Sequence, residues 1–198
     1  IDINDIPVDM IDRIEIYKGV VPARFGGSSL GGAINIVIRE YPDKYADLSY
    51  GYESFNTHKA QGVFKRNLKA RGLVFGIGGG YTTSDNNYTF DSPYRKGLRI
   101  TRNHDKYRKY IIGGSFKAKK WWFDEVEFEP VVVKTYKEVQ GIEYDIREAY
   151  SESLMAGLAN KLTKDNFLTE GLNFDMFSGV VLTQMNFIDK ATRRYEWD

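Results

Sequence analysis

The chain of 198 residues has no cysteine and only two histidines, His58 and His104. Without thiols it forms no disulfide and offers no thiolate ligand to a metal. The two histidines stand in different segments and match no ligand spacing such as HExxH, so the sequence predicts isolated surface histidines. We predict no metal site and no cofactor.

Long apolar runs and a strong net charge are also missing. No segment approaches the roughly 18 consecutive apolar residues of a transmembrane helix, which excludes a helical membrane protein. The lack of long apolar runs does not exclude a membrane β-barrel, because the strands of a barrel present only every second side chain to lipid. The 28 lysines and arginines nearly balance the 27 aspartates and glutamates, so we expect no nucleic-acid partner. No leader with a charged, apolar and small-residue pattern follows Ile1, and we expect a piece of a longer precursor.

A glycine-rich stretch between two alternating runs is the most distinctive local pattern. The runs Ile14 to Tyr17 and Ala33 to Ile38 alternate apolar with other residues and predict two strands of one small sheet. The doublets Gly26-Gly27 and Gly31-Gly32 predict a tight turn between them. A phosphate-binding loop is disfavoured, because no Lys-Ser/Thr follows the last glycine.

Residues 6–39 resemble the C-terminal end of the plug domain of TonB-dependent outer-membrane receptors. The shared features are an Ile-Glu-Ile strand, Lys-Gly, an Ala-Arg-Phe-Gly turn and the run Gly-Gly-Ala-Ile-Asn-Ile. The resemblance implies that residues 1–41 are the C-terminal part of an α+β plug domain. It implies that residues 42–198 are the N-terminal portion of an incomplete transmembrane β-barrel.

From Tyr45 onward, short segments alternate apolar with small or polar residues and predict a mainly β fold of about seven antiparallel strands. One face of these strands should collect the large apolar side chains and, in a barrel, meet lipid: Leu48, Tyr50, Tyr52, Leu73, Phe75, Ile77, Tyr110, Ile112 and Phe116. The other side of the strand near residue 77 is nearly bare, with Gly76, Gly78 and Gly80. Either close packing against a plug or a tight bend or bulge would explain these glycines.

The connections between the expected strands fall into two lengths. Residues 69–72, 119–122 and 163–170 predict short turns, and residues 82–106 and 134–153 predict long loops. Membrane barrels have this asymmetry, with short periplasmic turns and longer extracellular loops.

The segment 91–110 has seven basic and two acidic side chains on a nearly neutral chain. We therefore predict a loop that attracts an anionic ligand or lipopolysaccharide. Its candidate binding residues are Tyr94, Arg95, Arg99 and Arg102. An ordinary solvated loop is the alternative.

Two other groups of side chains allow more than one interpretation. Trp121 and Trp122 beside lysines are typical of an aromatic girdle at a membrane interface, although a soluble core or a sugar-binding platform could use the same rings. Glu125, Glu127 and Glu129 share one strand face, which favours the wet side of a barrel wall over a pair of glycosidase carboxylates.

By resemblance, the expected function is active uptake of a scarce nutrient across the outer membrane of a Gram-negative bacterium. The nutrient would be a siderophore, cobalamin or a glycan. The expected partners are this small ligand, outer-membrane lipid and lipopolysaccharide, and the TonB complex, which would engage an N-terminal plug region missing from these residues. No enzymatic activity is expected. The alternative is a soluble or secreted all-β ligand-binding module that uses aromatic platforms.

Overall fold

The computed structural model describes residues 11–19, 21, 31–38, 41–119, 122–141 and 146–190. The chain divides into two compact units, residues 1–42 and 43–198. The regular structure in the described residues is β, apart from the short 3₁₀ helix η4 (Lys69–Arg71). The expected mainly β, antiparallel fold is therefore confirmed. No helix in these ranges is long and apolar enough to cross a membrane.

The first unit contains two antiparallel strands, β1 (Ile11–Lys18) and β2 (Gly32–Ile38). Both were predicted from their alternation, and the register sets Tyr17 opposite Ala33. Gly26 and Gly27 of the predicted turn lie outside the described residues. Gly32 begins β2 with a φ of +136°, and a Cβ built there would overlap the carbonyl oxygen of Tyr17. Glycine is therefore required where this hairpin closes.

The two faces of the β1–β2 sheet differ sharply. Ile14, Ile16 and Ile34 are exposed on one face. On the other, the Glu15 carboxylate accepts hydrogen bonds from Asn35 Nδ2, the Tyr17 hydroxyl and Arg13 Nε, each at 2.9 Å. These bonds, from Asn35 foremost, lower the pKa of Glu15 from its ordinary 4.5 to about 2.

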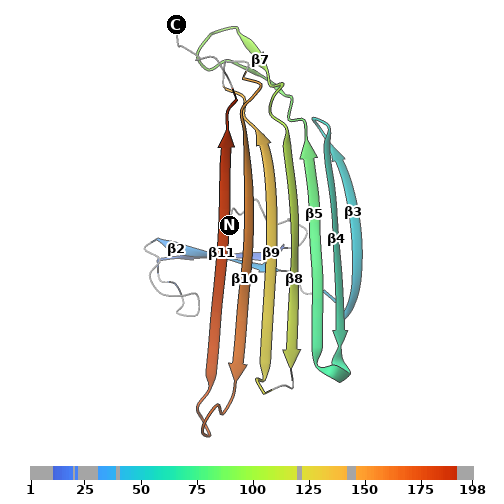
Figure 1. Ribbon diagram of the computed structural model, residues 1–198, viewed down its shortest axis with the longest axis vertical. Coiled ribbons are helices and arrows are strands. Elements are labelled where there is room, and N and C mark those ends of the chain that lie inside the picture. The colour runs from blue at the N-terminus through green and yellow to red at the C-terminus, as the bar shows by residue number, and fades with distance from the viewer. Residues whose placement is uncertain are drawn as a thin grey trace. The chain divides into compact units, whose positions relative to one another are not determined.

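The second unit is one antiparallel sheet of seven strands in the order β11-β10-β9-β8-β5-β4-β3. The strands are β3 (Lys44–Glu53), β4 (Thr57–Leu68), β5 (Leu73–Ser84), β8 (Tyr107–Lys119), β9 (Glu125–Glu138), β10 (Tyr150–Lys164) and β11 (Phe174–Ile188). The sheet is open, with β3 and β11 at its edges (Figure 1). Its strands have 10 to 15 residues, whereas a tilted strand needs about 9–11 to cross a bilayer.

Both long loops are shorter than the sequence predicted. β5 extends to Ser84, and β9 extends to Glu138 before β10 starts at Tyr150. The loops therefore run over residues 85–106 and 139–149 instead of 82–106 and 134–153. Near these loops both faces of the strands carry polar side chains. The alternation of apolar and polar residues is therefore lost there, although the backbone hydrogen bonds between the strands continue. The turn predicted at 163–170 lies at 165–173, because β10 extends to Lys164 and β11 begins at Phe174.

The loop at 85–106 is not aperiodic as expected, because it contains a small hairpin. β6 (Thr89–Asp91) and β7 (Arg99–Thr101) pair as a separate two-stranded sheet, drawn beyond the ends of the long strands in Figure 1. Strands of three residues are too short for periodicity to reveal.

The register assigns every strand residue to one of two faces, because directly paired residues lie on the same side. The nine residues predicted to share a face do so. We call this the apolar face and describe it in rows named after their β8 residue. The Ile112 row crosses the whole sheet through paired positions: Leu48, Gly62, Gly79, Ile112, Val132, Ala156 and Leu182.

The other face, the polar face, carries an ion-pair network near the turn ends of β8, β9 and β10. Lys117 Nζ lies 3.2 Å from Glu127 Oε1, and Glu125 lies within 3.4 Å of both Lys119 and Lys161. Farther along, on β11, this face is apolar, with exposed Phe177, Val181, Met185 and Phe187. Many large apolar side chains of the described residues are exposed. The buried apolar residues among them are Ala118, Val126, Val133 and Ala149.

Candidate functional site

The predicted ligand-binding residues lie in and beside the β6–β7 hairpin. Tyr94 is exposed, and the Ser92 hydroxyl accepts hydrogen bonds from the backbone N–H groups of Tyr94 and Arg95 at 3.1 and 2.9 Å. Arg99 is in β7, with its Nε 3.6 Å from Asp91 Oδ1, and both side chains are largely exposed. These three residues present their side chains from the tip of the loop.

Arg102 is placed differently, in the base of the loop. Its Nε lies 2.9 Å from Asp105 Oδ2, and its side chain is only 15% exposed. Its Nη2 donates to the carbonyl oxygen of Gln140 at 3.1 Å, and its guanidinium lies 6.0 Å from the centre of the Tyr88 ring. Arg102 is therefore held by groups of both long loops, and its role in binding a ligand stays a prediction.

Asp105 is the centre of a buried polar cluster that the sequence did not reveal. Its side chain is 3% exposed and lies within 2.9 Å of Arg102 and 2.6 Å of Lys137 Nζ. Asn86 Nδ2 also donates to it at 2.6 Å. A buried carboxylate needs such compensation, because desolvating it alone is costly. The Asp105 cluster (Asn86, Arg102, Asp105 and Lys137) joins the β5–β8 loop to strand β9.

A second set of bonds ties the two long loops to each other. Gln140 Oε1 accepts the backbone N–H groups of Asn103 and His104 at 2.8 and 3.0 Å. His104 Nε2 is 2.9 Å from the carbonyl oxygen of Ala149, and its Nδ1 is 3.5 Å from Glu138 Oε2. The prediction of an isolated surface histidine is wrong for His104, because its ring contacts Ala149 and Glu138 and is only 14% exposed.

An aromatic group lies at the same end of the sheet. Tyr88 has its ring centre 5.9 Å from those of Phe55 and Phe90. The backbone N–H of Asp85 donates to the carbonyl oxygen of Phe55 at 3.0 Å, so the β3–β4 turn is attached to the β5–β8 loop. Phe55 has a positive φ of 60°. Phe55 could not be identified from the sequence, because it meets Tyr88 only when the β3–β4 turn packs against the β5–β8 loop in the folded sheet.

Near the turn ends, Trp122 is exposed and its ring centre lies 4.7 Å from that of Phe123 and 5.7 Å from that of Phe167. Trp121 lies outside the described residues. Between the same turns, Asp124 accepts hydrogen bonds from the backbone N–H of Asp165 at 2.7 Å and from Lys164 at 3.2 Å. These bonds, the first foremost, lower the pKa of Asp124.

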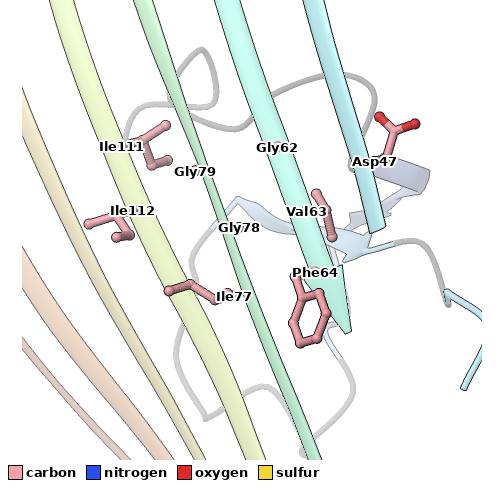
Figure 2. Close-up of a pocket in the computed structure, with 9 residues that line it drawn as sticks. All are labelled: Asp47, Gly62, Val63, Phe64, Ile77, Gly78, Gly79, Ile111 and Ile112. Carbon is pink, nitrogen blue, oxygen red and sulfur yellow. The ribbon is translucent and has the colours of Figure 1, made fainter. Parts of the chain in front are cut away.

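A shallow hollow of about 330 Å³ lies where glycines thin the sheet. Figure 2 shows its lining from β3, β4, β5 and β8: Asp47, Gly62, Val63, Phe64, Ile77, Gly78, Gly79, Ile111 and Ile112. Asp47 is the single ionisable side chain among them, so the hollow lacks the converging polar groups of a ligand site. In the described ranges, no three His, Asp or Glu side chains gather into a group that could hold a metal ion.

No protein-family model matches the chain, and no solved structure matches it. Two curated proteins are similar to part of it. The ferric enterobactin receptor of Pseudomonas aeruginosa is 34% identical over 82 residues, which are 41% of this chain and 10% of that receptor. The ferrienterobactin receptor of Escherichia coli K12 is 32% identical over 65 residues, which are 33% of this chain and 9% of that receptor. The matched part thus spans about a tenth of the length of each relative.

Proposed function

We propose that this chain is part of a nutrient receptor of the bacterial outer membrane. In this proposal, residues 1–41 are the C-terminal part of a plug domain and residues 42–198 are the first strands of a transmembrane barrel. The chain itself performs no covalent chemistry. The observation that carries the proposal is the composition of the apolar face, row by row.

The rows follow the polarity profile of a membrane. The Ile112 row contains only apolar side chains and glycine across all seven strands. On the loop side of it, the Tyr110 row pairs Tyr81 with Tyr110, and on the turn side the Phe116 row pairs Phe75, Phe116 and Phe128. An apolar band between aromatic girdles is the pattern of an outer-membrane barrel.

The spacing of the aromatic rows supports the same assignment. Phe75 and Tyr81 are six residues apart on β5, about 20 Å at about 3.3 Å per residue. On β9 the next aromatic side chain on the loop side is Tyr136, one row beyond the Tyr110 row, and it is eight residues from Phe128, about 26 Å by the same measure. These lengths bracket the roughly 25 Å height of the apolar band in membrane barrels.

The exposure of the apolar face disfavours the soluble-module alternative. Leu48 is 85% exposed, and Leu182 is 69% exposed. A soluble protein would need another layer to cover such side chains, whereas lipid covers them without one. The ion pairs of Lys117, Glu125 and Glu127 then lie on the wet inner side of the wall.

A ferric siderophore is the ligand class that we favour over cobalamin or a glycan. Both partial relatives are named as receptors for iron-loaded enterobactin. The basic surplus near Tyr94, Arg95 and Arg99 would raise the encounter rate of an anionic iron chelate. Uptake would be energised through TonB, and the cell's outer membrane would be the location.

Whole-cell uptake tests this proposal. Cells whose sole siderophore receptor is the full-length protein should accumulate iron-55 from a ferric siderophore, and inactivating TonB should abolish accumulation. Uptake of cobalamin or a glycan alone would reassign the ligand class. Recovery of the full-length protein in the soluble fraction without detergent would overturn the membrane assignment.

A further inference from the structure

Two cations interrupt the apolar face on its loop side. Arg108 of β8 pairs with Tyr136, and Lys134 of β9 pairs with Tyr110. They are therefore diagonal neighbours on adjacent strands, a relation that sets such positions roughly 7–8 Å apart. Both side chains are exposed, so their charged groups can converge on one anion.

Neither charge is neutralised within the part of the chain that the structure describes. No described carboxylate lies within 4.0 Å of Arg108 or Lys134, in contrast to Arg102 and Lys137, which share Asp105. The guanidinium of Arg108 lies over the ring of Tyr136, 5.5 Å from its centre. Glu152 pairs with Tyr136 from the β10 side and is half-buried. Glu138, two residues beyond Tyr136 on the same face, is the other carboxylate diagonal to Arg108. It is engaged by His104 Nδ1 at 3.5 Å and by the backbone N–H of Lys106 at 3.0 Å.

Their surroundings are those of a membrane interface. The rings of Tyr81 and Tyr110 are 4.7 Å apart, and those of Tyr136 and Tyr150 are 5.4 Å apart. Tyrosines concentrate at the headgroup level of membranes, where their rings are half in the apolar layer. One row farther toward the turns, the Ile112 row contains no polar side chain. An anion held by the two cations would therefore adjoin a surface suited to acyl chains.

We propose that Arg108 and Lys134 form a binding site for the phosphate of an outer-leaflet lipid. The arginine can hold two phosphate oxygens at once, and the lysine adds a point charge. The acyl chains lie along the Ile112 row, with Glu152 limiting the site on the β10 side. The inference rests on the proposed function, because it requires the apolar face to meet lipid.

Binding of a defined lipid to the full-length protein tests the site. The protein would be placed in phosphatidylcholine nanodiscs and titrated with diphosphoryl lipid A or with enzymatically dephosphorylated lipid A. We expect the protein to prefer the phosphorylated form. The double variant Arg108→Gln with Lys134→Gln should weaken this preference by about tenfold or more, because the free energy of hydrogen bonds to charged groups corresponds to such a change in affinity. Glu152→Gln should strengthen binding.

A control of equal charge separates the site from general attraction. Lys59→Gln with Lys96→Gln removes two exposed cations from the same end of the sheet and should leave the preference unchanged. Equal loss in both double variants, or no loss in the Arg108 and Lys134 variant, would overturn the site. Competition by inorganic phosphate as strong as by lipid A would also overturn it, as it would show a free-anion site. Siderophore uptake by the same variants reports on the proposed function separately.

Discussion

Gly32 is the most tightly constrained residue in the described part of the first unit. Its φ is +136°, and an added Cβ would overlap the Tyr17 carbonyl oxygen, while nothing lies within 4 Å of a Cβ on Gly31. We expect Gly32→Ala to destabilise the full-length protein by about 1–3 kcal/mol, the cost of a strained backbone. Chemical unfolding would measure it. Gly31→Ala is the matched control, and an equal effect of both would contradict the assignment.

Glu15 predicts an acid-dependent loss of stability. Its folded pKa of about 2 is below the ordinary 4.5, so its contribution is complete above about 4.5. It is lost as the pH falls from about 4.5 to about 2. Glu15→Gln should flatten the stability curve across this window. Carbon-detected NMR titration should find the carboxyl still ionised at pH 3.5, and a midpoint near 4.5 would contradict the hydrogen-bonded arrangement.

At the scale of the strand, β8 offers a direct test of the two faces. Ile112 and Ile111 are neighbours on opposite faces of the sheet. If the apolar face meets lipid, Ile112→Arg should cost about 2–4 kcal/mol for a site near the bilayer midplane. Ile111→Arg should cost less, because its side chain points to the polar face. Folding titrations in lipid vesicles would give both values. A larger cost for Ile111→Arg than for Ile112→Arg would show that the other face of the sheet meets lipid.

The two long loops should open together. Asp105→Asn removes the charge that compensates both Arg102 and Lys137, and breaking a buried pair costs about 3–5 kcal/mol. Because Arg102 also bonds to Gln140, we expect faster amide hydrogen exchange in both 85–106 and 139–149. Asp91→Asn, at an exposed pair with Arg99, should have little effect. Faster exchange in one loop alone would refute the coupling.

At the scale of the whole molecule, alternation was enough to predict the strands and the shared face of Leu48, Ile77 and Ile112. Period-two patterning works there because each face meets one kind of surroundings. It could not predict the ends of β5 and β9, where both faces are polar, or the short β6–β7 hairpin. Nor could it place His104 or Phe55, whose contacts depend on loops that meet only in the folded sheet. The predicted roles of Tyr94, Arg95 and Arg99 stay predictions.

The unpaired edges of β3 and β11 have a kinetic consequence in the proposed membrane setting. Each backbone N–H or C=O left without a partner in hydrocarbon costs several kcal/mol, and β11 alone has 15 residues. A strand entering the bilayer alone would pay this cost along both sides. Insertion should therefore be concerted, because a hairpin should cross the bilayer only after its strands have paired with a neighbouring strand. The slow step of biogenesis should be the pairing of the two last edge strands, which closes the barrel.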